Sequence, residues 1–234
     1  ANGTAASYTP QEIRTVAGKT TGIVTATSSS GDAAANVHVD TGLAETTGHA
    51  ITVVLTDTTP TALQLKTLDT LTTVPITFHA ANTGYVFSGN AADILTVLSA
   101  SGINSRADVP VTITGAVTVD QLNQINALTT GIVTTNAYQV SPTITQLAAL
   151  TLNVDSSGNQ VVDGGGNPVQ NVYKFTPPET TVSATALPTL NAKTSANINI
   201  TNVTTITGTL TELATFYTSG GLAAGFSNYA NKDV

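Results

Sequence analysis

The stretch "VTVDQLNQINALTTGIVTT" (residues 117–135) decides the fold, because it recurs as "YTPQEIRTVAGKTTGIVTA" (residues 8–26) at a constant offset of 109 positions. In each copy a threonine is followed three positions later by Glu or Gln, the pattern of a helix N-cap with a capping box. Apolar residues stand four and seven positions after the threonine, so they share one helix face. These residues are Ile13 and Val16 in the first copy and Leu122 and Ile125 in the second. The repeat therefore predicts a short amphipathic helix with one buried face, beginning at Thr9 or Thr118.

A glycine follows each of these helices, Gly22 in the first copy and Gly131 in the second. We expect both glycines to adopt the left-handed conformation that commonly ends a helix. The sequence "AGKT" (17–20) suggests a phosphate-binding loop, but such a loop needs a glycine five positions before its Gly-Lys pair, where this chain has Ile13. We therefore interpret this stretch as the end of a repeated helix and expect no nucleotide site.

The same template of a cap, an acidic or amide residue and two apolar residues recurs along the chain. It predicts six helix caps: Thr9, Thr61, Asn90, Thr118, Thr143 and Thr209. A degenerate copy places a seventh helix start at Ser183. Most starts are 25 to 29 residues apart, with one unit unrecognised near residues 30–40. This spacing is typical of a solenoid, in which each unit contacts its neighbours along the stack.

Short runs rich in β-branched residues lie between the predicted helices and are typical of strands. They cover residues 51–55, 75–80, 110–115, 132–135, 171–175 and 198–203. One strand and one short helix cannot bury both faces alone, whereas stacked units form a parallel sheet on one side and a row of helices on the other. We therefore predict an α/β fold, a β-rich solenoid of strand-plus-short-helix units of about 25–29 residues with parallel strands. The alternative is a parallel β-helix without helices, because the helices are short and threonine favours strands.

The domain organisation predicted from this period is a single elongated solenoid over residues 1–234. The segment "DSSGNQVVDGGGNPVQN" (155–171) breaks the period, so we expect a hairpin insertion at 153–175 with two turn motifs. The last residues, "NKDV" (231–234), resemble "RADV" (106–109), after which the internal copy enters a predicted strand. The sequence thus predicts one period of a longer head-to-tail array.

The composition excludes several classes of partner. Only 9% of the residues are charged and the net charge is −7, so no basic stripe is available to neutralise the phosphates of a nucleic acid. No run approaches the roughly 18 apolar residues of a membrane span. With no cysteine, the chain has neither a disulfide framework nor a thiolate metal site. A surface that depends on hydroxyls and amides suits the outside of a cell.

Candidate ligand-binding residues are few. Oxygen ligands suited to calcium occur in glycine-rich turns at Asp155, Asn159, Asp163 and Asn167, although a turn-forming role explains them as well. His38 and Asp40 could share a strand face, but an ordinary surface role is favoured over metal binding. No local motif builds a Ser, His and Asp constellation, so no enzyme is expected, while a distant carboxylate pair is left open. No cofactor is predicted apart from this candidate calcium.

The stretch "VTITGAVTVDQLNQINALTTGIVTT" (111–135) resembles the threonine-rich repeats of very large secreted bacterial surface proteins of the kind common in cyanobacteria. The resemblance implies an extracellular or cell-surface, non-catalytic role in an adhesin, a surface layer or a matrix fibre. Together with the repeat, it predicts a structural module whose partners are head-to-tail copies of itself. The alternative function is a glycan- or calcium-binding surface module.

Overall fold

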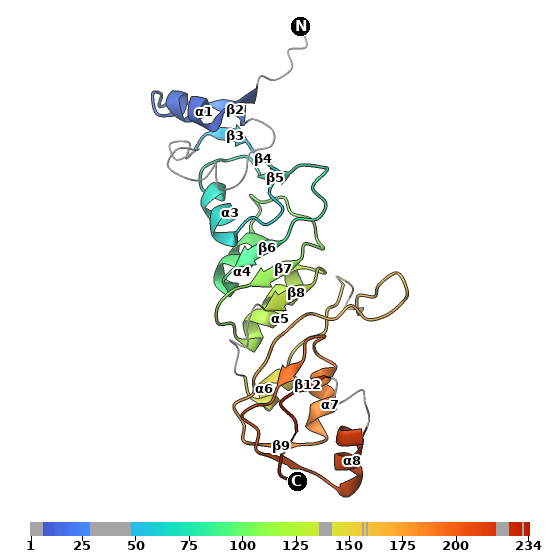
Figure 1. The fold of residues 1–234 in the computed structure, drawn as a ribbon. Helices are drawn as coiled ribbons and strands as arrows, with labels where there is room; N and C mark the ends of the chain where they lie inside the picture. The colour runs from blue at the N-terminus through green and yellow to red at the C-terminus, as the bar shows by residue number, and fades with distance from the viewer. Residues whose placement is uncertain are drawn as a thin grey trace. The chain divides into compact units, whose positions relative to one another are not determined.

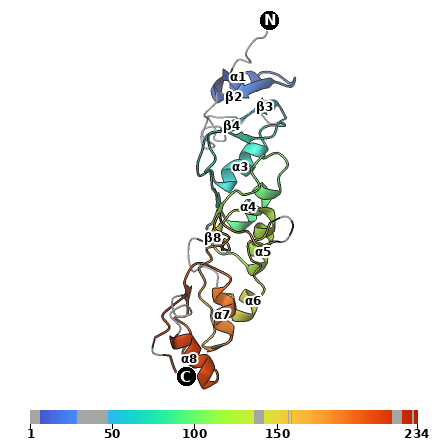
Figure 2. The same cartoon turned by 90° about the vertical axis from the view of Figure 1, so that its right-hand side faces the viewer.

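The computed structural model describes residues 7–28, 48–135, 142–155, 157, 159–218, 225–230 and 232–234. The chain divides into two compact units, Ala1–Val109 and Pro110–Val234. Both units combine α-helices with short parallel strands (Figure 1, Figure 2). The predicted α/β class is therefore confirmed, and the alternative of a β-helix without helices is wrong.

Helices and short strands are interspersed along each unit. The first unit contains β1 (Ser7–Tyr8), α1 (Pro10–Ala17), β2 (Thr25–Ser28), β3 (Ala50–Thr52), β4 (Val54–Leu55), α3 (Ala62–Asp69), β5 (Thr77–Phe78), β6 (Phe87–Gly89) and α4 (Ala91–Ser99). The second contains β7 (Val111–Ile113), α5 (Val119–Leu128), β8 (Val133–Thr135), α6 (Ile144–Ala148), β9 (Thr181–Ser183), α7 (Ala186–Asn191), β10 (Ile198–Asn199), β11 (Thr205–Thr207), α8 (Leu210–Thr218) and β12 (Phe226–Ser227). The unit predicted near residues 30–40 lies outside the described residues.

Strand pairing within each unit is parallel. In the first unit β2 pairs with β1 and β3, and β4 pairs with β5. In the second unit β7 pairs with β8, β9 with β11, and β10 with β12. Paired residues lie from 20 positions apart, as in Ser7 and Thr27, to 28 apart, as in Ile198 and Phe226. Each strand therefore pairs with one about one sequence unit away, which is the geometry of a short crossover between parallel strands.

Five of the six predicted strand runs contain a strand, and the run at 171–175 does not. Its Val172 makes a single parallel bridge to Thr134. Strands β1, β2, β6, β9, β11 and β12 lie outside the predicted runs.

Most of the apolar residues predicted to face the interior are buried. They are Ile13, Leu65, Leu68, Ile94, Val97, Leu122, Ile125, Leu147, Leu150, Leu187, Leu190 and Phe216. Two positions differ: Leu213 is only partly buried, and Val16 is 55% exposed. The prediction that Val16 is buried is wrong because its side chain lines an open groove beside α1.

The predicted helix-ending glycines do not have left-handed backbones. The described glycines with positive φ are Gly48, Gly89, Gly115 and Gly166. Instead, a threonine side chain turns the chain after the helix. Thr20 Oγ1 accepts a hydrogen bond from Gly22 N at 3.0 Å, and Thr129 Oγ1 accepts one from Gly131 N at 2.9 Å. Because a hydroxyl that accepts the amide two residues on stabilises a turn without positive φ, the left-handed prediction was wrong at both glycines.

The same threonine turn follows α3 and α7, where it also reaches the neighbouring strand segment. Thr72 Oγ1 accepts a hydrogen bond from Val74 N at 3.1 Å, and Thr194 Oγ1 accepts one from Ala196 N at 3.1 Å. Both threonines are buried. The turn therefore recurs in the two units at an offset of 122 residues.

Close packing at two glycines is similar in the two units. A Cβ atom at Gly102 would overlap the Asp69 carboxylate, and one at Gly225 would overlap the Asn191 amide. Gly102 O accepts a hydrogen bond from Ile76 N at 2.8 Å, and Gly225 O accepts one from Ile198 N at the same distance. Each unit therefore brings a glycine against the end of a helix at matching positions.

An antiparallel insertion separates two parts of the second unit. Val154 bridges Gln160 and Val162 bridges Pro168, both antiparallel, so two tight turns follow one another. This pairing lies inside the predicted hairpin at 153–175, whose later residues return to parallel pairing at Val172. The insertion explains why the offset between the copies rises from 109 before it to 122 after it.

Candidate functional site

The predicted caps lie at the starts of helices. For α1, α3, α5 and α6 the cap side chain accepts the amide three residues on, and the Glu or Gln there accepts the cap's own amide. These caps are Thr9, Thr61, Thr118 and Thr143. Asn90 Oδ1 accepts a hydrogen bond from Asp93 N at 2.9 Å, and Thr209 N donates to Glu212 Oε2 at 2.7 Å. The predicted caps therefore form hydrogen bonds within the first turn of their own helices, which explains these residues without a ligand.

The seventh predicted start, at Ser183, is wrong. Ser183 lies in β9, and α7 begins at Ala186 with Thr185 as its N-cap residue. Thr185 makes no capping hydrogen bond: Pro188, three positions on, has no amide hydrogen to donate, and the Thr185 hydroxyl lies 2.7 Å from Ser183 Oγ.

The four candidate calcium ligands form two matching turns. Asp155 Oδ1 accepts hydrogen bonds from Ser157 N and Asn159 N, both at 2.9 Å. Asp163 Oδ1 accepts them from Gly165 N and Asn167 N, both at 2.8 Å. These backbone hydrogen bonds lower the pKa of both carboxyl groups below the usual value. Each carboxylate therefore stabilises its own turn.

The metal predictions gain no geometric support from these turns. Each asparagine directs its amide nitrogen toward the aspartate, Asn159 Nδ2 at 3.5 Å and Asn167 Nδ2 at 3.2 Å from Oδ2. In the described parts of the chain no three His, Asp or Glu side chains gather as metal ligands. His38 and Asp40 lie outside the described residues. Calcium binding stays a prediction.

The two described histidines have structural contacts. His49 is 9% exposed, and its Nδ1 accepts a hydrogen bond from Val24 N at 2.9 Å. In the second unit, Asn171 Oδ1 accepts one from Val133 N at 2.8 Å in the matching position. His79 Nδ1 accepts a weaker bond from Ala81 N at 3.2 Å. The His49 side chain therefore has a structural role, since it bonds the backbone of the neighbouring strand segment at Val24.

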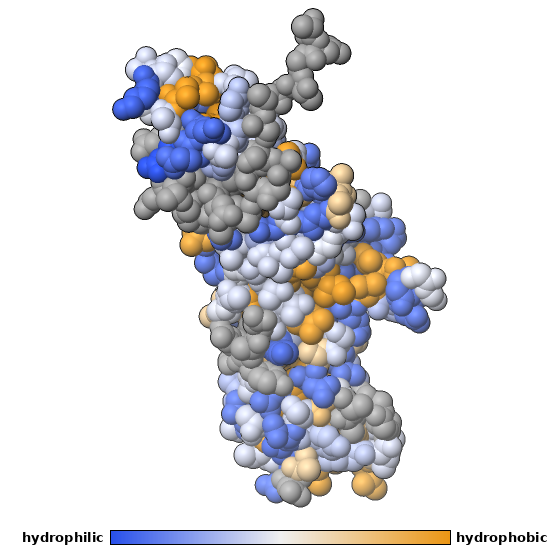
Figure 3. All heavy atoms as spheres, turned by 45° about the horizontal axis from the view of Figure 1, so that its top comes forward, coloured by the Kyte–Doolittle hydropathy of each residue, from blue (hydrophilic) through white to orange (hydrophobic). Residues whose placement is uncertain are grey.

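An apolar groove of about 420 Å³ lies between α1 and β2 in the first unit. It is lined by Tyr8, Glu12, Ile13, Val16, Val24, Thr25 and Ala26. Hydrophobic surface is visible over this part of the chain in Figure 3. Beside the groove, Ile23 is 77% exposed. Exposed apolar side chains that gather in one place are typical of an interaction site.

The matching positions of the second unit are buried. Val117, Leu122, Ile125 and Val133 correspond to Tyr8, Ile13, Val16 and Val24, and none of these four is more than 5% exposed. Tyr8 is 46% exposed and Val16 is 55% exposed. The same sequence pattern therefore forms a core in one unit and a surface in the other.

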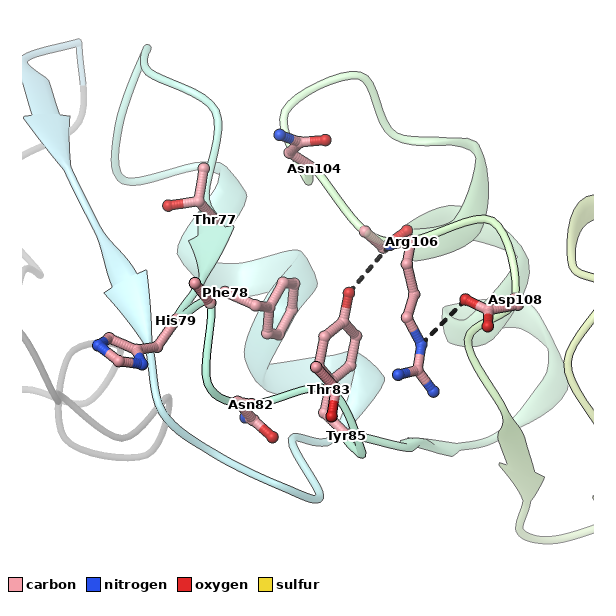
Figure 4. Close-up of a pocket in the computed structure, with 11 residues that line it drawn as sticks. Thr77, Phe78, His79, Asn82, Thr83, Tyr85, Asn104, Arg106 and Asp108 are labelled. Atoms are coloured by element: carbon pink, nitrogen blue, oxygen red, sulfur yellow. Dashed lines mark hydrogen bonds and ion pairs between the residues drawn. The ribbon is translucent and has the colours of Figure 1, made fainter.

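A second pocket, of about 530 Å³, lies in the first unit beside the strand β5 (Figure 4). Its aromatic wall is a stack, in which the rings of Phe78 and Tyr85 are 4.0 Å apart and inclined by 14°. The guanidinium of Arg106 lies 5.1 Å from the centre of the Tyr85 ring. Tyr85 Oη also accepts a hydrogen bond from Arg106 N at 2.9 Å. The stack is thus fixed by an aromatic contact, a cation–π contact and a hydrogen bond.

The rim of this pocket is polar. Arg106 Nε lies 3.1 Å from Asp108 Oδ1, an ion pair at the edge of the stack. Thr83, Asn104 and Ser105 also line the pocket, and their side chains have no hydrogen-bond partner among the residues the structure describes. The pocket therefore offers an apolar wall together with unused donors and acceptors, an arrangement common in sites for small ligands.

The sequence pattern did not predict this pocket, because residues 75–80 indicate a strand and "RADV" (106–109) stands out only by its resemblance to the last four residues. A compositional signal was present. Aromatic residues make up 5% of the chain, yet Phe78, Tyr85 and Phe87 fall within ten positions.

Among the helices that the structure describes, none combines the length and apolar character needed to cross a membrane. Comparison of the chain with models of protein families, with curated proteins and with solved structures gives no match.

Proposed function

We propose that this chain is a non-catalytic structural module that associates head to tail with further copies of itself. One observation carries the proposal: apolar positions that are exposed beside α1 are buried at the matching place beside α5. Tyr8 and Val16 are 46% and 55% exposed, whereas their counterparts Val117 and Ile125 are 5% and 0% exposed. Covering such a surface is favourable in proportion to the apolar area removed from water.

Residues near the C-terminal end of the chain show a corresponding difference in exposure. Val109, the last residue of the first unit, is fully buried, while its counterpart Val234 is 75% exposed. The backbone just before it is ordered in the stack, because Asp233 N donates to Thr204 O at 2.9 Å and Asp233 O accepts from Ile206 N at 2.8 Å. The occupant that would restore both buried patterns is a second copy of this chain, with its α1 following Val234.

The pairing pattern supports the finer description of the fold as a solenoid. Side-chain contacts repeat at similar separations, as in Lys66 with Asp93, 27 positions apart, and Asn126 with Leu152, 26 positions apart. Helices α3 and α4 pack together in the first unit, and α6 and α7 do so in the second. A stack of such units exposes apolar faces at its ends unless they are covered.

We place this module outside the cell, in a fibre, a surface layer or a large adhesin. The placement rests on the resemblance of residues 111–135 to secreted surface repeats and on the low content of charged residues, 9%. Calcium is not required by the proposal.

Sedimentation velocity over a range of protein concentrations tests the proposal. We expect the wild type to form species of increasing mass, whereas Val16→Asp stays monomeric because a charge is placed in the apolar groove. Leu63→Asp is the matched control, since Leu63 is 58% exposed on α3 and lies outside the groove. A wild type that stays monomeric at every concentration, or equal effects of both substitutions, would overturn the proposal.

A further inference from the structure

We propose that the pocket beside β5 binds a neutral saccharide, with the sugar ring against Phe78 and its hydroxyls on the Arg106–Asp108 pair. This inference is independent of head-to-tail association. It starts from a cluster whose aromatic side chains are absent at the matching positions of the second unit. The cluster consists of Phe78, Tyr85, Arg106 and Asp108, and it lies entirely within the first unit.

The duplication shows which side chains the architecture requires. Thr77 N donates to Val53 O at 3.0 Å, and Asn199 N donates to Phe175 O at 2.8 Å in the second unit, so Phe78 corresponds to Ile200. The parallel bridge of Thr61 with Ser88 matches that of Ser183 with Thr207. Tyr85 and Phe87 therefore correspond to Thr204 and Ile206. The second unit keeps the same pairing without aromatic residues at these positions, so the strand pairing itself does not require them.

The chemistry of the pocket selects the ligand class. Phe78 is partly exposed and presents an apolar surface, which suits the C–H face of a sugar ring. Asp108 is an acceptor and Arg106 a donor, held 3.1 Å apart, so together they can bond two neighbouring hydroxyls. Asn104 and Thr83 add further unused polar groups on the same rim.

The charge of the site favours an uncharged ligand. Asp108 neutralises Arg106, and the chain as a whole has a net charge of −7. An anionic polymer would therefore meet no net positive charge in the pocket and would be repelled at longer range. The volume of about 530 Å³ is in the range of small-ligand sites.

Calorimetric titration with cellohexaose, maltohexaose and mannohexaose, and with polygalacturonate as the anionic comparison, tests the inference. The protein carries Val16→Asp, so that self-association does not contribute heat. We expect at least one of these neutral oligosaccharides to bind, and Asp108→Asn to weaken binding about tenfold through loss of a charge-assisted hydrogen bond. Phe78→Ala should abolish measurable binding.

The matched control is Asp233→Asn, which alters the corresponding aspartate of the second unit and should leave affinity within about twofold. Circular dichroism of each variant checks that the fold is retained. Three results would overturn the inference: no binding of any of the three oligosaccharides, an equal loss in Asp108→Asn and Asp233→Asn, or preferential binding of polygalacturonate that strengthens in Asp108→Asn. The last result would identify an anion site instead.

Discussion

Thr72 takes the place of a strand partner for Ile51. Its Oγ1 accepts a hydrogen bond from Ile51 N at 3.0 Å and donates one to Ile51 O at 2.6 Å. In the second unit, Thr194 Oγ1 accepts from Tyr173 N at 2.8 Å and donates to Tyr173 O at 2.9 Å. One hydroxyl therefore satisfies both backbone groups of a buried residue, which explains in part why the fold uses so much threonine.

Replacing this hydroxyl should be costly. Thr72→Val keeps the shape of the side chain but leaves Ile51 N, Ile51 O and Val74 N without their partner. We expect a loss of about 2–4 kcal/mol in the free energy of unfolding, because each unsatisfied buried group costs about 1–3 kcal/mol before relaxation. Urea unfolding followed by circular dichroism measures the change.

Two controls accompany this substitution. Thr72→Ser retains the hydroxyl and should lose less than about half as much as Thr72→Val. Thr20→Val removes the equivalent hydroxyl at an exposed turn, so its cost should be below about 1 kcal/mol. Equal losses of stability in Thr72→Val and Thr20→Val would show that the hydrogen bonds of Thr72 with Ile51 do not add to the stability.

The capping threonines should each have a smaller, local effect. Thr118 Oγ1 accepts a hydrogen bond from Gln121 N at 3.2 Å, and Thr118 N donates to Gln121 Oε1 at 3.0 Å. Thr118→Ala should lower the free energy of unfolding by about 1 kcal/mol, whereas Thr118→Ser should be close to neutral. Faster amide exchange at the start of α5 in the alanine variant alone is the expected signature. Unchanged exchange there argues against the cap.

The pair between α3 and α4 should make the first unit sensitive to acid. Lys66 Nζ donates to Asp93 Oδ1 at 2.5 Å, and this bond lowers the pKa of Asp93 below its ordinary value of 3.8. Because folding lowers the pKa of Asp93, the ion pair stabilises the fold fully when the pH is above the pKa of Asp93 in the unfolded chain. This stabilisation is lost as the pH falls through the lower pKa of Asp93 in the folded protein.

Asp93→Asn should therefore cost about 1 kcal/mol at neutral pH, a modest value since Lys66 is 46% exposed. The difference between variant and wild type should shrink as the solution is made acidic. Thermal melts of both proteins at a series of decreasing pH values measure this difference. A difference that stays the same at every pH would show that the ion pair does not cause it.

The aspartate turns of the insertion give an expectation for calcium. Since Asp155 and Asp163 each accept two backbone amides, we expect Asp163→Asn to loosen the second turn, with faster amide exchange at Gly165 and Asn167. Millimolar calcium should leave the melting temperature unchanged. A calcium-dependent rise that disappears in Asp163→Asn would instead support the calcium site.

The sequence was most informative where structure depends on near neighbours. Caps such as Thr61 and Thr143 were predictable because the bond to the residue three positions on is a local property. The exposure of Val16 and the role of Thr72 were not, because both depend on what lies about one sequence unit away. The aromatic pocket also escaped prediction, since Tyr85 and Arg106 are brought together by the stacking of segments 21 positions apart.

Crosslinking between introduced cysteines tests head-to-tail association most directly, because the chain contains no cysteine of its own. In the second unit Val111 N donates to Ile132 O at 3.0 Å, and Val111 follows Val109 by two residues. The counterparts of Ile132 and Val109 are Ile23 and Val234, which are 77% and 75% exposed. These two positions should therefore be neighbours across a join between copies.

Chains carrying Ile23→Cys and chains carrying Val234→Cys are treated with a short bismaleimide, separately and as a mixture. We predict that the mixture gives a crosslinked dimer, that neither variant alone does so, and that the double variant gives a ladder of multimers. A dimer from Ile23→Cys alone would mean a symmetric face-to-face contact, and the absence of any crosslink in the mixture would mean that copies do not join head to tail.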